Sequence, residues 1–370
     1  MQESRGYKNR CSRIKAAIML EAALLLAIGV IYLGENSGNG VMKVTGDGYI
    51  KWVDFNVSYE ALCKAYEYDV STYGSEIHLD WIELLAYVAA QNGGDFDAGA
   101  AQDIHDLAEM LLSGETTMKK LTKDMKYYDY YKEAYTAVLG GFVGEYEVQE
   151  TEGGAYTKMY GLKAFSPIAK GFEYSDYDDF GVSRSYGYRR QHLGHDMMGQ
   201  VGTPIIATES GIVEALGWNQ YGGWRIGIRS FDGKRYYYYA HLRQNYPYQE
   251  KLKEGDIVTA GEVIGYMGHT GYSTTENVNN IDQVHLHFGL QLIFDESQKE
   301  GDNEIWVDCY DLTRFLYKNR SEVYKAEGTK EWKRKYDMKD SSVQEYQKTV
   351  KSKKTKEKTK SSSEESEQKE

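Results

Sequence analysis

The chain has 370 residues, of which 14% are aromatic, and it carries a formal net charge of −12 at pH 7. This length allows two domains, and the aromatic content favours folded domains over disorder. The acidic balance predicts no nucleic-acid partner, because a phosphate backbone is bound by a basic surface.

The three cysteines, Cys11, Cys63 and Cys309, form no CxxC pair. A cysteine-based zinc site is therefore excluded, and any metal has to be held by histidine, aspartate or glutamate. Cys11 precedes the apolar segment described next and is not expected to pair with the other two across a membrane. A disulfide between Cys63 and Cys309 stays open as the less favoured alternative to free thiols.

The N-terminus carries a topological signal. Five basic residues fall within residues 1–15, and the apolar run 16–34 follows them. That run is about long enough to cross the ~30 Å hydrocarbon layer of a bilayer. It predicts a transmembrane signal anchor, with residues 1–15 in the cytoplasm and the bulk of the chain extracytoplasmic. The alternatives are a cleaved signal peptide and a buried helix of a soluble domain. No small-x-small cleavage site follows Leu33, which favours the anchor.

Residues 35–56 are polar and predict a linker, and residues 57–150 predict a small α-helical domain. In the stretch HLDWIELLAYVAAQNGGDF, Asp80 is the expected N-cap of a helix and Gly93 lies in its stop signal. The stretches AAQDIHDLAEMLLSGE and YYDYYKEAYTAVLGGF repeat the helical pattern, and the tyrosines of the second are expected to pack in a core. Glu83 is a candidate glycosidase acid, but the sequence offers no convincing second carboxylate to act with it on the bond, so a solvated helix charge is favoured.

Beyond residue 160, short strand-like runs separated by glycine turns replace the helical pattern, and Asp232-Gly233 predicts a hairpin. The sequence thus predicts an α+β chain in which residues 160–317 form an antiparallel β domain. Residues 318–370 are charged and predict a helix followed by a disordered tail rich in Lys, Ser and Glu.

Six of the eight histidines lie between positions 192 and 287, inside the predicted β domain. In the stretch QVHLHFGL, His285 and His287 alternate with Leu286 and Phe288. Alternate residues of a strand face the same side, so we expect both histidines on one face and the apolar residues on the buried face. The pair either shares a metal ion or divides the work between a ligand and an acid–base group.

Upstream, the stretch RRQHLGHDMMGQVGTPI contains the pattern HxxxD, which begins at His192 and ends at Asp196. Imidazole nitrogen and carboxylate oxygen both suit zinc. The stretch YYYYAHL places His241 at the end of a strand. Each of these histidines alone is more often structural than functional, and only their joint occurrence favours a metal site.

The motifs HxxxD, GTPxxAxxxGxV, YxHL, GxxVxxGxxIGxxGxTGxS and HLHF follow one another between about residues 180 and 290. In this order they resemble the lysostaphin/LytM-type zinc metallopeptidases, which cut peptide bonds in bacterial cell walls. The resemblance implies an antiparallel β-sheet peptidase domain of the barrel-sandwich type, with peptidoglycan peptides as substrate and the active site in an open groove.

By this resemblance, His192, Asp196 and His287 are the ligands of one Zn2+, and His241 and His285 are the catalytic histidines. One of the two would help to deprotonate the attacking water, and both would stabilise the oxyanion. An imidazole with an ordinary pKa near 6.5 suits that task near neutral pH.

Some neighbouring residues have no expected catalytic role. His195 and His269 are expected at the surface or rim of the site, and Gly194 is interpreted as a turn or close-approach residue. The stretch TTENVNNIDQ, residues 274–283, departs from the family's spacing and is expected to border the substrate groove. Four aromatic side chains either form walls of the groove or pack in the interior, and both alternatives stay open: Trp218, Tyr221, Trp224 and Tyr272.

Two other functions stay open. The first is a catalytically quiet or partner-gated scaffold of the cell envelope, in which the helical domain regulates the groove or docks a protein partner. The second is a zinc peptidase that cuts protein instead of cell wall. All five key positions hold the residues of the family pattern, which favours an active enzyme.

Overall fold

The computed structural model describes most of the chain after the N-terminal segment. The described residues are 49–352, apart from 152, 186–188, 300 and 302. The predicted basic segment 1–15, the predicted anchor 16–34 and the end of the predicted tail, 353–370, lie outside them. Among the described residues, no helix combines the length and the apolar character that crossing a membrane requires.

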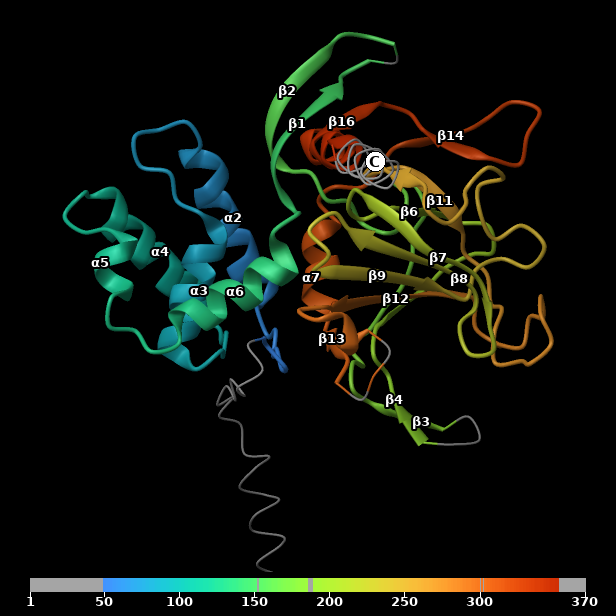
Figure 1. Ribbon diagram of the computed structural model, residues 1–370, viewed down its shortest axis with the longest axis horizontal. Helices are drawn as coiled ribbons and strands as arrows, with labels where there is room; N and C mark the ends of the chain where they lie inside the picture. Colours follow the sequence, from blue (N-terminus) through green and yellow to red (C-terminus); the bar gives the residue numbers. More distant parts are fainter. Residues whose placement is uncertain (1–48, 152, 186–188, 300, 302, 353–370) are drawn as a thin grey trace, which may run out of the picture. The chain divides into compact units, whose positions relative to one another are not determined.

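Helices form the first part of the described chain, as predicted, and they gather in one cluster (Figure 1). Asp80 caps its helix by accepting a 2.9 Å hydrogen bond from the main-chain nitrogen of Glu83, and Gly93 ends the helix with a φ of 69°. The helices are α2 (Tyr59–Thr72), α3 (Trp81–Asn92), α4 (Ala100–Leu112), α5 (Met118–Thr122) and α6 (Tyr128–Leu139).

Apolar residues on one side of the long helices form the helical core. On α3, Leu84 and Val88 are fully buried at the helical spacing that predicted them. On α6, Tyr135 is fully buried, and its ring meets the ring of Phe55 edge-on at a centroid distance of 5.3 Å. The tyrosines of α6 are therefore packing residues, as expected.

Two alternatives that the sequence leaves open are decided in this region. The Glu83 carboxylate pairs with Lys132 at 2.5 Å and is half-buried, which fits a helix surface charge and not a glycosidase acid. Cys63 and Cys309 are free thiols. The alternative disulfide between them is therefore absent.

The predicted linker 35–56 is wrong from Ile50 onward. Ile50, Val53 and Phe55 are buried, and the Ile50 carbonyl accepts a 2.9 Å hydrogen bond from the side chain of Gln298. The apolar residues of this stretch alternate over too few positions to signal burial, and their packing partners lie far along the chain.

The predicted end of the helical domain at residue 150 is too late. Strands β1 (Val143–Gln149) and β2 (Tyr156–Leu162) form an antiparallel hairpin, and β16 (Met338–Asp340) pairs with the other edge of β1. Only Tyr146 and Val148 alternate with polar residues in β1, because Val143 is out of phase with them, so the strand pattern in the sequence is short.

The prediction of a charged helix from residue 318 is also wrong up to Asp340. Besides β16, this segment forms the antiparallel pair β14 (Val323–Lys325) and β15 (Trp332–Arg334). Each of the three strands has only three residues, too few for alternation to be visible. Main-chain pairing with other segments, and not local preference, stabilises them.

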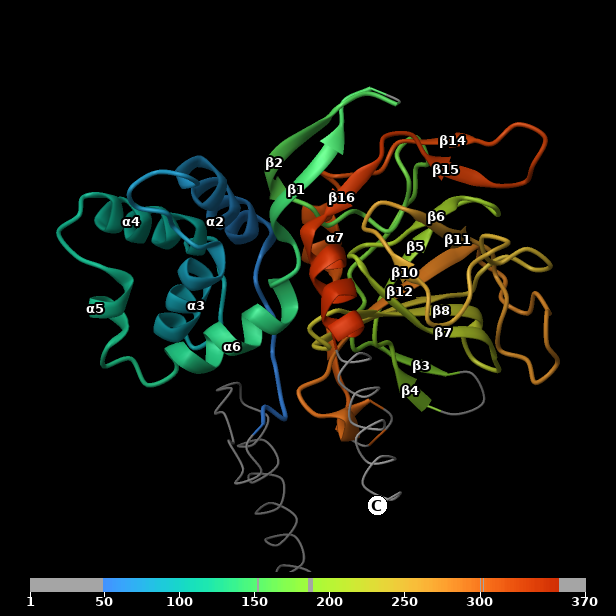
Figure 2. The same cartoon turned by 45° about the horizontal axis from the view of Figure 1, so that its top comes forward.

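An antiparallel sheet forms the centre of the predicted β domain (Figures 1 and 2). Its strand order is β10-β7-β8-β9-β12-β13, and β5 also pairs with β12. The predicted hairpin joins β8 to β9, where Gly233, at a φ of 74°, donates a 2.9 Å hydrogen bond to the Ser230 carbonyl. The strands are β5 (His195–Met198), β7 (Gly211–Asn219), β8 (Gly223–Ser230), β9 (Arg235–Ala240), β10 (Ile257–Val258), β12 (His285–Leu292) and β13 (Ile305–Val307).

Shorter elements surround this sheet. They are the pairs β3 (Ser183–Ser185) with β4 (Arg189–Gln191) and β6 (Pro204–Ile206) with β11 (Val263–Tyr266), and helix α7 (Tyr310–Leu316). The ring of Phe315 on α7 meets Tyr66 of α2 edge-on at 5.5 Å and stacks with Trp81 of α3 at 5.8 Å. Helix α7, which follows β13 of the sheet in the chain, therefore packs directly against the helical cluster.

Candidate active site

The pairing of β5 with β12 brings the candidate residues together. In this antiparallel register His287 lies opposite Asp196. Phe288 is fully buried on the other face of β12, so His285 and His287 share the open face, as strand alternation predicts. His192 lies on the loop just before β5. Residues almost a hundred positions apart are thus placed side by side by one strand pair.

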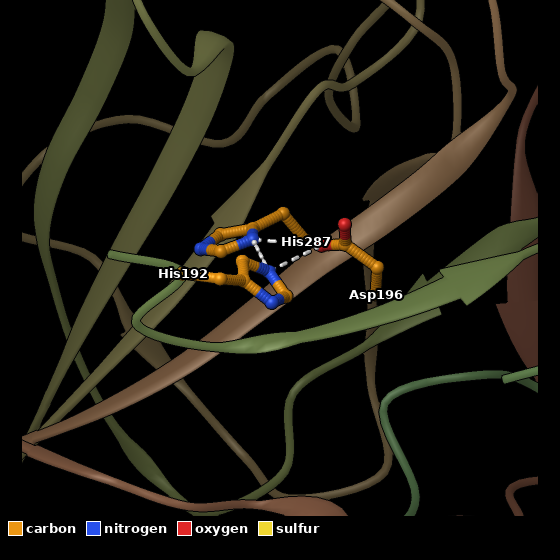
Figure 3. A group of neighbouring side chains, drawn as sticks. All are labelled: His192, Asp196 and His287. Atoms are coloured by element: carbon orange, nitrogen blue, oxygen red, sulfur yellow. Dashed lines mark hydrogen bonds and ion pairs between the residues drawn. The ribbon is translucent and has the colours of Figure 1, made fainter. Parts of the chain in front are cut away.

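Three of these side chains point at one another (Figure 3): the potential ligand atoms of His192, Asp196 and His287 all lie within 4.8 Å of one another. Asp196 Oδ1 is 3.0 Å from His192 Nε2 and 2.8 Å from His287 Nδ1, and the two nitrogens are 3.1 Å apart. His192 and Asp196 are buried, whereas His287 is half-buried. The structure therefore gathers the three predicted ligands into one cluster.

The chemistry of these three atoms favours a cation between them. His192 Nδ1 lies 2.9 Å from Asp179 Oδ1 and donates there, so neutral His192 turns a lone pair at Nε2 toward Asp196 and His287. Three lone-pair atoms at these distances repel one another unless a proton or a metal ion lies among them. Two imidazole nitrogens and one carboxylate oxygen are a zinc donor set, so the residues present fit the predicted metal.

Two residues outside the sequence motifs orient this cluster. Arg184 Nη1 donates a 2.7 Å hydrogen bond to Asp196 Oδ2, and its Nη2 pairs with Asp179. Asp179 in turn holds His192, so one guanidinium fixes two carboxylates around the donor set. Sequence reasoning missed both residues, because neither belongs to a motif. Asp179 lies in the acidic stretch SDYDDFG, in which nothing distinguishes it from its neighbours.

His241 and His285 present the same ring atom to the site. His241 Nδ1 lies 2.9 Å from the Thr270 carbonyl, and His285 Nδ1 lies 2.8 Å from the Gln283 carbonyl. A carbonyl only accepts, so each Nδ1 carries the proton and each neutral ring keeps an Nε2 lone pair. The two ring centroids are 4.7 Å apart, and His285 Nε2 lies 3.6 Å from Asp196 Oδ2. Both rings therefore border the cluster.

Burial sets the protonation states of these residues. Burial alone would raise the pKa of Asp196, but the rings of His192 and His287, which donate to this carboxylate when a proton lies on the facing nitrogen, outweigh it and hold that pKa well below its usual range. Burial lowers the pKa of His241, and the neighbouring His285 and His287 lower it further. Burial also lowers the pKa of His287, although Asp196 opposes the change. Neutral imidazole and ionised carboxylate are the forms that bind a metal ion.

Gly194 leaves the space that the His287 ring occupies. A Cβ added at this position would lie 2.6 Å from His287 Cε1 and 2.8 Å from the Phe288 carbonyl oxygen. Both distances are shorter than any ordinary contact, so the interpretation of Gly194 as a close-approach residue is confirmed.

Two hollows flank the cluster. The first has a volume of about 570 Å³ and is lined by His287, Tyr221 and Tyr272, among others. The second, of about 480 Å³, is lined by His285, Tyr272 and residues 280–283. Tyr272 lines both, and each contains residues of the cluster, His192 and His287 in the first and Asp196 in the second. We call the two hollows the arms of the groove. The inserted loop therefore borders the groove, as predicted.

The structure also tests the remaining expectations for this region. Trp218 and Trp224 line neither arm and pack edge-on against each other at 5.7 Å, so they are packing residues. The surface position predicted for His195 is wrong, since this residue is 2% exposed and its Nε2 lies 2.9 Å from Asp176 Oδ2. His269 is half-buried, and its Nδ1 lies 2.6 Å from a main-chain carbonyl.

The family match agrees with this geometry. Residues 190–307 match the model of Peptidase family M23, so the chain carries an M23 peptidase domain. The segment covers the cluster and both further histidines but none of the helical cluster α2–α6.

Individual proteins that the chain resembles are endopeptidases of this type. It is 39% identical over 124 residues to the L-Ala–D-Glu endopeptidase of Bacillus subtilis, covering 34% of this chain and 36% of that protein. It is 37% identical over 135 residues to lysostaphin of Staphylococcus simulans, covering 36% and 24%. The chain thus spans about a third or less of the length of these relatives.

Among solved structures, the chain resembles a lytM from Ruminococcus gnavus, with a TM-score of 0.50 and 25% identity. That likeness covers 73% of this chain and 91% of the other. It therefore extends well beyond the M23 segment.

Proposed function

We propose that the protein is a zinc endopeptidase that hydrolyses peptide bonds in bacterial peptidoglycan. The observation that carries the proposal is the position of His241 and His285, each with its Nδ1 proton held by a carbonyl, beside the cluster of His192, Asp196 and His287. A donor set for zinc and two rings with free Nε2 atoms are what metal-assisted hydrolysis of a peptide bond requires.

The chain's own residues divide the work as follows. His192, Asp196 and His287 would hold the ion, and zinc there would supply a Lewis acid that lowers the pKa of water. One of the two rings, His285 or His241, accepts the proton of the attacking water at Nε2 and, as an N–H donor, stabilises negative charge on the substrate oxygen. The same ring then gives that proton to the leaving amine nitrogen when the peptide bond breaks. Asp179 and Arg184 keep the donor atoms in place.

For the cellular setting, we propose that the chain is a single-pass membrane protein with its peptidase domain outside the membrane. The support is the basic segment 1–15 followed by the apolar run 16–34. The substrate class is supported by the matched M23 segment and by relatives that include an L-Ala–D-Glu endopeptidase.

Digestion of purified peptidoglycan tests the proposed function. The compact unit Lys43–Glu370 is incubated with several wall types, with zinc, with chelator, and as the His285→Ala variant. We expect chelator-sensitive release of cut peptides, identified by mass spectrometry, and a loss of about 10²–10⁴-fold in rate for the variant. Unchanged zinc content and thermal melting of the variant are the controls.

If the folded, zinc-loaded protein cuts no wall type and no stem peptide, the proposed endopeptidase activity is refuted. The remaining function would then be a quiet or partner-gated envelope scaffold, with the helical cluster α2–α6 as the docking part.

A further inference from the structure

One arm of the groove is built on a single face of the central sheet. His287 lies opposite Ala240 in the pairing of β12 with β9, and Tyr238 lies opposite Gly227 in the pairing of β9 with β8. Arg225 is two positions before Gly227 on β8 and therefore shares this face. His287, Tyr238, Ala240 and Arg225 all line the 570 Å³ arm. A guanidinium thus stands on the same surface as a predicted zinc ligand, two strands away.

The charge of Arg225 has no partner among the described residues. No ion pair or side-chain hydrogen bond joins its guanidinium to another described group, and its Nη1 is buried without a hydrogen-bond partner. The side chain as a whole is half-buried and lines the groove, so its remaining edge is open to an incoming group. A carboxylate bound at that open edge would form charge-assisted hydrogen bonds with the guanidinium.

The other cations of this arm differ from Arg225. The Lys299 ammonium is paired with Glu214, and the Arg190 guanidinium lies 4.6 Å from the centroid of the Tyr272 ring. Arg229, on the same strand face as Arg225, is paired with Glu214 and Glu296. Arg225 is therefore the groove guanidinium whose charge the described residues leave uncompensated.

The two arms also differ in charge. Among the described lining residues, the arm with Arg225 contains Arg190, Lys299 and one carboxylate, Glu304. The described lining of the arm beyond the cluster contains Asp179, Asp196 and Asp282 with one cation, Arg184, which is already paired. A peptide that crosses the cluster meets positive charge in one arm and negative charge in the other. Its negatively charged end is therefore favoured in the arm with Arg225, which fixes the orientation of the bound peptide.

We propose that Arg225 forms a carboxylate-binding subsite in this arm, and that the preferred substrate is a peptide with a free carboxylate beside the bond that is cut. This inference rests on the proposed endopeptidase function and makes it narrower. A stem peptide with an ionised D-Glu carboxylate fits the subsite, whereas a neutral glycine bridge does not. The planar fork of arginine pairs with a carboxylate through two parallel hydrogen bonds.

The test compares two synthetic stem peptides that differ in one group, the D-Glu α-carboxylate in one and a carboxamide in the other. The zinc-loaded unit Lys43–Glu370 is expected to prefer the carboxylate peptide by about ten- to a hundred-fold in kcat/KM. Arg225→Gln is expected to bring that ratio close to one, and Arg225→Lys to give an intermediate ratio. Lys325→Met removes an exposed cation outside the groove and is expected to keep the wild-type ratio.

Binding provides a second readout that does not depend on turnover. Calorimetry on the His285→Ala variant, with and without Arg225→Gln, measures the Kd of both peptides. The same ten- to hundred-fold preference is expected, and it is expected to vanish with Arg225→Gln. Far-ultraviolet circular dichroism checks that the substituted proteins are folded.

Two failures are distinguishable. If the wild type cuts neither peptide but still binds the carboxylate form more tightly through Arg225, the endopeptidase function is wrong and the subsite stands. If both peptides are cut or bound equally well, or if the preference survives Arg225→Gln, the subsite is refuted while the endopeptidase function is untouched.

Discussion

Arg235, on strand β9 of the sheet, donates a 2.9 Å hydrogen bond to the main-chain carbonyl of Ala137 near the end of helix α6. The same guanidinium binds Glu209, at 2.7 Å from Nε to Oε2, and is only 2% exposed. One buried cation therefore satisfies a helix C-terminus and a buried carboxylate together. The helical cluster and the sheet share this contact.

Replacement of Arg235 by an uncharged residue should lower the free energy of unfolding substantially. Arg235→Met leaves Glu209 buried without its ion pair and the α6 carbonyls without a donor. We expect a loss of about 3–5 kcal/mol in the free energy of unfolding, measured by urea denaturation. Arg314→Met, which breaks an exposed pair with Asp311, is the control and should cost about 0–1 kcal/mol. Equal losses for the two variants would contradict the buried role of Arg235.

Gly194→Ala should impair catalysis more than stability. The new Cβ would lie 2.6 Å from His287 Cε1, so the ring has to move away from Asp196. We expect weaker zinc binding and a kcat/KM at least ten-fold lower, since a 1 Å misplacement can cost about a hundred-fold. Gly144→Ala is the matched control, because its Cβ meets only the flexible Lys163 side chain at 3.5 Å. Normal zinc affinity and rate in Gly194→Ala would count against this packing argument.

Asp179→Asn should weaken metal binding without touching a ligand. The carboxylate accepts the Nδ1 proton of His192 and fixes which nitrogen faces the cluster. Loss of such an outer partner typically lowers metal affinity about 10–100-fold. Competition with a chromophoric chelator measures the Kd for zinc. The neighbouring exposed Asp178→Asn serves as control and should bind zinc like the wild type.

Asp340→Asn should destabilise the protein at neutral pH but much less in acid. Burial would raise the pKa of Asp340, but the Lys163 ammonium at 2.9 Å and the Ser210 hydroxyl at 2.7 Å outweigh it and lower that pKa. A folded pKa below the unfolded value means that the contribution is fully present above the unfolded pKa, near 3.8, and is lost as pH falls through the folded pKa.

Urea denaturation of wild type and Asp340→Asn at a series of pH values between 7 and 2 measures this dependence. The difference in unfolding free energy should be constant at the upper end and shrink below about pH 4. A difference that stays constant across the whole range would mean that the ionised carboxylate contributes nothing. Asp311→Asn, at a surface ion pair, is the control and should show only a small difference.

The sequence predicted the centre of the site better than its surroundings. Strand alternation predicted that His285 and His287 share a face, and the resemblance to a known family added His192, Asp196 and His241. The structure gathers all five. Asp179 and Arg184 could not be found in this way, because a carboxylate or guanidinium that orients a ligand needs no fixed distance from it along the chain. His195 was misplaced for a related reason. The sequence around His195 gives no sign of Asp176 and Tyr310, which contact its ring and bury it.

The same distinction holds for the fold. The local sequence predicted helix α3 and the β8–β9 hairpin, because both carry their own signals. Asp80 and Gly93 mark the start and end of the helix, and Asp232-Gly233 marks the hairpin turn. The segment from Ile50 and the strand β16 have no such signals. Their conformation depends on partners more than a hundred positions away, such as Gln298 for Ile50 and Val148 for Met338.

The pairing of β1 with β16 has a consequence for the order of events during synthesis. Val148 faces Met338, and about half of the chain separates them. A ribosome releases β1 and β2 long before β16 exists, so one edge of β1 offers unpaired main-chain groups throughout translation of the peptidase region. Completion of that small sheet is therefore a late step. A chain truncated before Met338 would keep every residue of the catalytic cluster. The edge of β1 that β16 normally pairs with would then stay unpaired and open to association with other chains.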